Sequence, residues 1–189
     1  MIVTPSTFDI SKVHYSTIKY LDNGIKWKYI NYAGGVFMVQ TPEMHLPFGL
    51  SLDSGSGTKW TLDLSFRDIQ TRPELQRFLD MLKALEKDII NTACLNKQEW
   101  FPYKKYTCRI IQELFYPLIR YNRDMRTGNM FPPIIKVRVP FENEDFVTDV
   151  YDKNRKKLNL REVNTRGGCA VVIMQCTGIL IETNMFGCK

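Results

Sequence analysis

Aromatic and basic side chains are interspersed between Trp100 and Arg126, and this segment is the chain's best candidate for chemistry. Bases stack on aromatic rings, at about 1–3 kcal/mol per base, while phosphates attract Lys and Arg. A single strand of nucleic acid would suit such a segment, although core rings and solvated cations explain it equally well. The candidates for strand contact here are Trp100, Tyr103, Lys104, Lys105, Tyr106, Tyr116, Arg120 and Tyr121.

Two later segments add positive charge. Residues 135–141 alternate apolar residues with Lys136 and Arg138, which predicts a strand with both cations on one face. Residues 146–151 and 158–163 predict a β-hairpin with the most basic tip in the chain. A solvated face or loop explains either feature as well as phosphate binding does. From the tip we take Lys153, Arg155, Lys156 and Lys157 as phosphate-binding candidates.

An amino-terminal hairpin supplies two further candidate rings. Residues 25–32 and 36–41 are β-forming runs joined by the glycine turn at residues 33–35. Aromatic or apolar side chains fall on both faces of the first run, so we expect some of its rings to be exposed. We therefore add Trp27 and Tyr29 as candidates for base stacking.

The chain lacks the residue patterns of common enzyme classes. Its two histidines, His14 and His45, lie in no recognisable acid, base or nucleophile motif. There is no GxxxxGK[ST] phosphate loop and no strand-bound GxGxxG. We expect Asp145 and Asp149 in surface ion pairs rather than around a metal, and a cysteine nucleophile beside a histidine stays open. The prediction is a protein that is not an enzyme and holds no metal or cofactor.

Cysteine usage and hydropathy indicate the compartment. The 5 cysteines are odd in number and show no zinc-ribbon or CxxC spacing, so we expect them reduced. Cys169 and Cys176 lie in an apolar run and should be buried. No stretch approaches the roughly 20 apolar residues that cross a bilayer, and residues 1–16 lack a secretory signal. We therefore expect an intracellular, unexported protein with no membrane partner.

Length and charge narrow the class further. With 189 residues, 44% of them hydrophobic, the chain can bury a core, and its length predicts a single domain over residues 1–189. A net charge of +6 and an isoelectric point near 9.0 favour polyanionic partners. Because the chain stops directly after an apolar strand, we also expect that a final strand or polar tail is missing.

The regular elements predict a chain that is mainly β with one principal helix. Residues 60–66 alternate with a period of two, as in a half-buried strand with Trp60 in the core. Residues 71–74 have the form of a capping box and precede a helical apolar period that ends at Ile90. Residues 169–176 and 179–183 have the composition of the most buried strands. This α+β content is typical of an OB-fold-like antiparallel barrel with insertions.

Three stretches carry a family resemblance: residues 114–120 (LFYPLIR), residues 132–140 (PPIIKVRVP), and the glycine-broken strands that close in residues 185–187 (MFG). Together they resemble the single-stranded-DNA-binding proteins of nucleocytoplasmic large DNA viruses. The resemblance runs loosely from Trp27 to the end of the chain, and its motifs are patterns of apolar and basic positions.

The resemblance implies an oligonucleotide-binding fold that coats DNA exposed during viral replication, repair or recombination, without base specificity. It implies a location in the host cytoplasm or at viral replication sites, or packaging in the virion. From the resemblance we expect phosphate contact only at Lys136 and Arg138, and at Arg120 beside Tyr116 and Tyr121. The role of the basic hairpin is an electrostatic inference of our own.

A structural protein is the competing interpretation. Tyr, Trp and Arg are also enriched at protein interfaces, so the same surface would suit a virion structural or scaffold protein. Such a protein would self-associate tightly whether or not DNA is present. RNA as the ligand, homo-oligomerisation and contacts with replication proteins stay open, because no residue pattern decides them.

Overall fold

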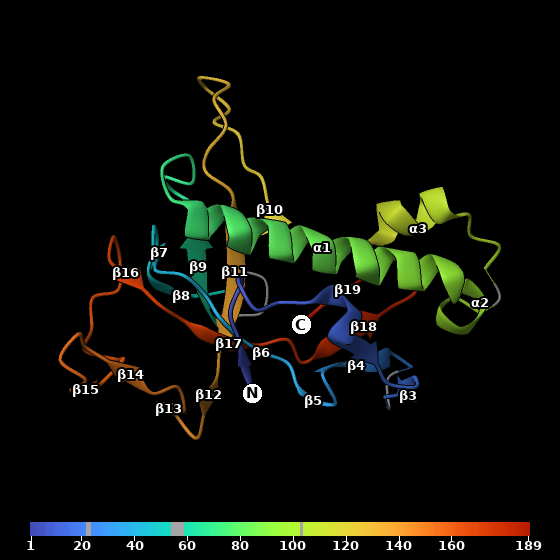
Figure 1. Ribbon diagram of the computed structural model, residues 1–189, viewed down its shortest axis with the longest axis horizontal. Coiled ribbons are helices and arrows are strands. Elements are labelled where there is room, and N and C mark those ends of the chain that lie inside the picture. Colours follow the sequence, from blue (N-terminus) through green and yellow to red (C-terminus); the bar gives the residue numbers. More distant parts are fainter. Residues whose placement is uncertain (22–23, 54–58, 103) are drawn as a thin grey trace. The chain divides into compact units, whose positions relative to one another are not determined.

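The computed structural model describes residues 1–21, 24–53, 59–102 and 104–189, and Figure 1 shows their helices and strands. The chain forms two compact units. Unit 1 consists of Met1–Pro42, Gln70–Ile119 and Val172–Lys189, and unit 2 consists of Glu43–Ile69 and Arg120–Val171. Because each unit is built from separated segments, no single cut in the sequence divides them. The single domain stays a prediction.

The longest helix, α1 (Pro73–Leu95), lies in unit 1 and confirms the principal helix that the apolar period predicts. The capping box is wrong, because Arg72 rather than Thr71 is the N-cap and makes no side-chain cap hydrogen bond. Proline in the first turn is tolerated because its missing N–H has no intrahelical partner there. The buried side chains of α1 are Leu75, Phe78, Leu79, Met81, Leu82, Leu85, Ile89 and Ala93.

Shorter helical elements of unit 1 are η1 (Ile10–Lys12), α2 (Lys97–Trp100) and α3 (Cys108–Leu114). The Thr107 hydroxyl caps α3 by accepting the amide of Ile110, at 3.3 Å. Ile111, fully buried, holds α3 in the core of this unit.

The larger sheet of unit 1 is antiparallel. Its strands run in the order β19 (Phe186–Cys188), β18 (Gly178–Ile181), β4 (Lys26–Tyr32) and β2 (Val13–Tyr15), and β3 (Lys19–Tyr20) and β5 (Gly35–Val36) also pair with β4. The predicted first hairpin is confirmed for β4 and β5. Its turn places Ala33 and Gly34 at φ angles of 47° and 80°, as a tight two-residue hairpin turn requires.

A second sheet of unit 1 contains β1 (Ile2–Val3), β6 (Met38–Gln40) and β17 (Ile173–Gln175), in that order. The predicted strand over residues 36–41 is therefore wrong as one continuous partner of β4. Phe37 is fully buried after β5, and the chain then pairs with strands from both ends of the sequence.

The sheet of unit 2 has the order β10 (Ile119–Arg120), β11 (Ile134–Val139), β9 (Trp60–Ser65), β7 (Met44–His45) and β16 (Cys169–Ala170), with β8 (Leu50–Leu52) also on β9. The chain enters this unit within β10. Strands β9 and β11 confirm two predicted strands. They are antiparallel in a register that runs from Ile134 opposite Ser65 to Val139 opposite Trp60.

The predicted burial of β9 is wrong in part. Leu64 and Phe66 are fully buried as expected, but Trp60 is only half-buried. The opposite face is buried as well, at 5–8% exposure, through Thr61, Asp63 and Ser65. Because both faces of β9 are covered, the period of two does not separate a core face from a solvent face.

Two short hairpins of unit 2 pair β12 (Phe141–Glu142) with β13 (Asp145–Phe146) and β14 (Val150–Tyr151) with β15 (Lys157–Leu158). The second is the predicted basic hairpin, confirmed in its inner residues. Its ladder is shorter than predicted, because it joins only Val150 to Leu158 and Tyr151 to Lys157.

Residues 169–176 are less buried than predicted. Cys169 and Ile173 are exposed, because β16 and β17 are outer strands of their sheets in the described part of the chain. The expectation of a buried thiol is wrong for Cys169 and confirmed for Cys176, at 7% exposure. The prediction of a buried strand over residues 179–183 holds for β18, in which Ile179 is fully buried.

These elements make the protein α+β, mainly β with one main helix, as predicted. Among the described residues, the strand pairings follow open paths and close no ring. The strand pairings therefore support the α+β class, and the OB-fold-like barrel stays a prediction.

Candidate nucleic-acid interface

Strand β4 sorts its side chains onto two different faces. Lys28, Ile30 and Tyr32 are buried on one face, whereas on the other Trp27 is half-buried and Tyr29 is 43% exposed. The separation arises because successive residues of a strand point to opposite faces. The open face of β4 thus presents two of the predicted rings side by side.

The two rings and a nearby lysine form one compact cluster. The ring centres of Trp27 and Tyr29 lie 6.1 Å apart at an interplanar angle of 73°. Lys19 pairs with Trp27 in the β3–β4 ladder, and its Nζ lies 4.8 Å from the centre of the Tyr29 ring. We call Lys19, Trp27 and Tyr29 the aromatic face. Its rings can stack on bases, and its cation can attract a phosphate.

A glycine of the neighbouring strand sets the position of Trp27. Gly178 of β18 lies opposite Tyr29, and a Cβ at this position would lie 2.7 Å from two carbons of the Trp27 ring. The same Cβ would lie 2.5 Å from the Lys28 carbonyl oxygen. The indole therefore packs closely against the backbone of β18, an approach that only glycine permits.

Lys19 and Tyr20 are absent from the sequence-based set of candidates. Tyr20 is 70% exposed in β3, and Lys26 Nζ lies 5.9 Å from the centre of its ring. The sequence does contain a signal, since a basic and an aromatic residue stand next to each other shortly before the predicted hairpin. The strand β3 brings this pair beside Trp27.

Trp100 is a core residue and not an exposed ring. It is 1% exposed and packs edge-to-face on Phe186, with ring centres 5.8 Å apart. A ring buried to this extent offers no face to a base, so we remove Trp100 from the candidate interface.

The buried face of β4 carries cations that bind protein groups instead of phosphates. Lys28, 6% exposed, lies 3.3 Å from the Glu99 carboxylate and 5.7 Å from the centre of the Trp100 ring. Lys26 donates a hydrogen bond to the Trp100 carbonyl oxygen at 2.8 Å. Burial lowers the pKa of Lys26, and the Glu99 carboxylate opposes this shift. These contacts hold α2 against the sheet of unit 1.

The segment after α2 presents two exposed cations. Lys104 and Lys105 are exposed, whereas Tyr106 is half-buried and packs on Phe101 with ring centres 5.5 Å apart. The Tyr106 hydroxyl donates a hydrogen bond to the Thr183 carbonyl oxygen, at 3.4 Å. Contacts within unit 1 therefore take up part of the Tyr106 ring and its hydroxyl group. Tyr103 lies outside the described residues.

Tyr116 lies on the edge of the larger sheet of unit 1. Its amide donates to the Phe186 carbonyl oxygen at 2.7 Å, and its side chain is 44% exposed. A Cβ at Gly187 would lie 3.0 Å from the Tyr116 carbonyl oxygen, so a glycine again allows close approach. Among the described candidate rings of unit 1, Tyr116 is thus as exposed as Tyr29, whereas Trp27 is half-buried.

Unit 2 holds the cations that the family resemblance singles out. Arg138 of β11 is exposed, but Lys136 is half-buried and its Nζ lies 3.8 Å from Asp53. Arg120 is half-buried in β10, and the following Tyr121 is 54% exposed. Lys136 is therefore partly neutralised, and Arg138 is the cation of this strand that faces solvent.

The basic hairpin β14–β15 is an ordered turn with exposed cations at its tip. Lys153, Arg155 and Lys156 are exposed, and the Asp152 carboxylate accepts the amides of Asn154 and Lys156, at 2.8 and 2.9 Å. These bonds hold the tip in one conformation. The tip thus presents three cations from a preformed turn.

Lys157 differs from the other cations of the tip, because its ammonium forms an ion pair with Asp149. The hydrogen bond from Lys157 lowers the pKa of Asp149. Asp145 forms a similar pair with Arg161 at 3.1 Å. The prediction that Asp145 and Asp149 form surface ion pairs is confirmed.

The described residues contain no cluster of three or more His, Cys, Asp and Glu side chains placed to hold a metal ion. None of their helices combines the length and the apolar character that crossing a membrane requires. No model of a known protein family matches the chain, and no curated protein matches it. The geometry described above is therefore the basis for any functional proposal.

Proposed function

We propose that this protein binds single-stranded DNA without sequence specificity and acts, without catalysis of its own, in viral DNA replication, repair or recombination. The observation that carries the proposal is the aromatic face. Trp27 and Tyr29 project from the open side of β4, and Lys19 stands beside them. Rings on an open sheet stack on any base, because every base has a flat face.

Exposed cations of both units support the same proposal. Unit 1 adds Lys104 and Lys105, and unit 2 adds Arg138 and the tip of the basic hairpin. Together with a net charge of +6, they favour a polyanion. Lys136 contributes less, because Asp53 already neutralises part of its charge.

An OB-fold-like barrel with insertions belongs to this proposal. It is supported by sheets that are antiparallel except for the pairing of β1 with β6, by the single main helix and by the open aromatic sheet face. The viral family, an intracellular location at replication sites or in the virion, and contacts with replication proteins belong to the proposal as well. They rest on the resemblance of residues 114–120, 132–140 and 185–187.

The direct test is a titration of fluorescently labelled oligothymidine, with duplex DNA of equal charge as the control ligand. The anisotropy of the label should rise at lower protein concentration with the single strand than with the duplex. The affinity should fall with salt, because bound phosphates release counterions. Oligouridine of equal length measures the DNA-to-RNA preference. Equal affinity for single strand and duplex would overturn the stacking mechanism.

One observation favours a structural or scaffold role as the second candidate. Strand β17 is an outer strand of its sheet and exposes Ile173 to 51%, and the other outer strand, β1, exposes Ile2 to 47%. Exposed apolar edges of this kind can pair with a second chain. Light scattering without DNA separates the two roles: self-association that ignores added oligothymidine would favour the scaffold.

A further inference from the structure

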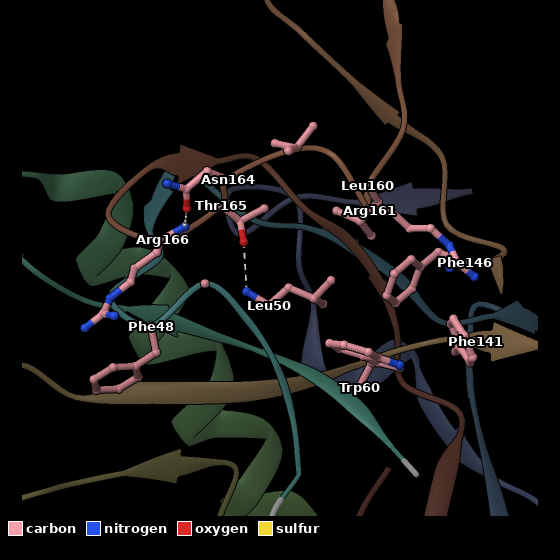
Figure 2. A pocket seen from close by; sticks show the side chains of 12 residues that line it. Phe48, Leu50, Trp60, Phe141, Phe146, Leu160, Arg161, Asn164, Thr165 and Arg166 are labelled. Atoms are coloured by element: carbon pink, nitrogen blue, oxygen red, sulfur yellow. Dashed lines mark hydrogen bonds between the residues drawn. The ribbon is translucent and has the colours of Figure 1, made fainter. Parts of the chain in front are cut away.

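Unit 2 contains a pocket that the sequence does not reveal. Its volume is about 470 Å³, within the range of roughly 300–1,000 Å³ that is usual for small-molecule sites. Its walls come from residues 48–50 at the start of β8, from Trp60 of β9, from Phe141 and Phe146 of the hairpin β12–β13, and from residues 160–161 and 163–166. Figure 2 shows the aromatic residues Trp60, Phe141 and Phe146 grouped on one side, and Phe48 and Arg166 on the other.

The rings on the first side form a continuous aromatic wall. Trp60 and Phe146 pack edge-to-face with centres 5.2 Å apart, and Phe141 and Phe146 lie 5.0 Å apart at 67°. Each of the three rings is half-buried and not sealed in the core. A flat ligand can therefore reach a ring face, and rings that hold one another in place lose little freedom when it binds.

The charged groups that line the pocket are cations. Arg161 lies 5.6 Å from the centre of the Phe141 ring and bonds to Asp145 through Nε, at 3.1 Å. The exposed Arg166 stands opposite the aromatic wall. No carboxylate lines the pocket among the described residues. The lining thus suits a flat ring that carries an anionic group.

Hydrogen bonds fix the loop that carries Arg166. The Thr165 hydroxyl accepts the Leu50 amide at 2.8 Å, and Asn164 Oδ1 accepts the Arg166 amide at 3.2 Å. Gly49 has a φ of +67°, and a Cβ there would lie 2.8 Å from the Arg166 amide nitrogen. The segment at Gly49 therefore packs directly against the backbone of residues 165–166, and this contact holds the Arg166 side of the pocket in place.

We infer that this pocket binds one base of a single strand against the aromatic wall, with a phosphate of the same strand at Arg166. The inference rests on the proposed function and adds to it a site that anchors a nucleotide. A purely apolar guest, such as a peptide side chain, would use the rings but leave the Arg166 guanidinium group without an anion, whereas Arg161 is already paired with Asp145. The basic hairpin supports the assignment, because β15 leads directly into residues 160–166 of the same unit.

Tryptophan fluorescence can test the pocket and the aromatic face separately. The chain has three tryptophans, of which Trp100 is buried and should report no ligand. In a Trp27→Phe variant the responsive tryptophan is Trp60, and in a Trp60→Phe variant it is Trp27. Both variants keep an aromatic ring at the changed position. Each is titrated with oligothymidine and with thymidine 5′-monophosphate, while anisotropy reports whether the oligonucleotide binds.

If the pocket binds a base, oligothymidine should quench the Trp60 fluorescence of the Trp27→Phe variant. Millimolar thymidine monophosphate should quench it too. Oligothymidine that binds and quenches only Trp27 would overturn the pocket and leave the proposed function intact. Quenching of Trp60 by the mononucleotide without any binding of oligothymidine would overturn the proposed function and retain the nucleotide site. An absence of both responses would overturn both.

Substitution of Arg166 tests the phosphate-binding role of this side chain. Arg166→Ala should weaken oligothymidine binding and make its salt dependence shallower by about 0.7 in the log–log slope, the change expected when one phosphate of a single strand is no longer neutralised. Arg126→Ala removes an exposed arginine from the same unit outside the pocket and is the matched control. Equal slopes for the two variants would exclude a phosphate at Arg166.

Discussion

Neighbouring residues of β4 show how one position along a strand decides the role of a side chain. Trp27 and Tyr29 face outward and can meet a ligand, whereas Lys28 between them is 6% exposed and paired with Glu99. A lysine in a basic protein is easily assigned to phosphate binding from sequence. Here the Lys28 side chain lies on the buried face of β4, where it pairs with Glu99 of α2 instead. Charge alone is therefore a poor guide to the interface.

Gly178 provides a test of the aromatic face at a single residue. Gly178→Ala would place a methyl group 2.7 Å from the Trp27 ring and 2.5 Å from the Lys28 carbonyl oxygen, so the indole and the adjoining backbone of β4 must shift. We expect weaker oligothymidine binding and an altered Trp27 emission spectrum in the folded protein. Gly35→Ala is a control for added side-chain volume, because Gly35 has no positive φ and a Cβ there would meet no atom closer than 3.9 Å. Unchanged binding by Gly178→Ala would show that the position of Trp27 is immaterial.

Glu86 gives a prediction about pH. Its carboxylate accepts the amides of Leu118 and Ile119, at 2.6 and 3.1 Å, and burial raises its pKa above 4.5 although these bonds oppose the shift. A raised carboxyl pKa means that folding favours the protonated form. Its contribution to stability is therefore complete below pH 4.5 and is lost as the pH rises through the folded-state pKa.

Glu86→Gln removes this titration and keeps an oxygen that can accept an amide hydrogen bond. The free energy of unfolding of Glu86→Gln, relative to the parent, should therefore rise between about pH 4 and pH 7. Urea unfolding at both pH values measures it. A parent protein that gains stability relative to Glu86→Gln over this interval would contradict the assigned direction.

At the scale of elements, the basic hairpin is the clearest test of electrostatic binding. Replacing Lys153 and Lys156 with Ala should weaken binding to any sequence. The salt slope should become shallower by about 0.7 for each phosphate that is no longer neutralised. Lys157→Ala should have a smaller effect, because Asp149 already neutralises that cation. Lys87→Ala, on the exposed side of α1, is the control.

Local patterns predict the elements whose signals are local. The apolar period of α1 and the glycine turn between β4 and β5 are confirmed, because both depend on residues close in sequence. The pairing of β6 with β1 and β17 cannot be predicted in this way, because its partners come from the two ends of the chain. The exposure of Trp60 depends on Phe141 of β12 and Phe146 of β13, which also lie far from it in sequence.

At the scale of the whole molecule, the candidate residues divide between the two units. Unit 1 contains the aromatic face, Lys104, Lys105, Tyr106 and Tyr116. Unit 2 contains the basic hairpin and the pocket beside Trp60. The sequence predicts the rings of β4 and the cations of the hairpin because residue type is visible there. It does not distinguish exposed Tyr29 from buried Trp100, since burial depends on the assembled core.

The central claim is that the aromatic face binds single-stranded DNA by stacking, and a matched pair of variants tests it most directly. Tyr29→Leu keeps an apolar side chain but removes the ring, whereas Tyr29→Phe keeps the ring. The measurement is the affinity of each variant for labelled oligothymidine at one fixed salt concentration. We predict that Tyr29→Phe binds like the parent and that Tyr29→Leu binds about 5- to 150-fold more weakly, the equivalent of about 1–3 kcal/mol. Equal affinity of the two variants for oligothymidine would contradict the claim.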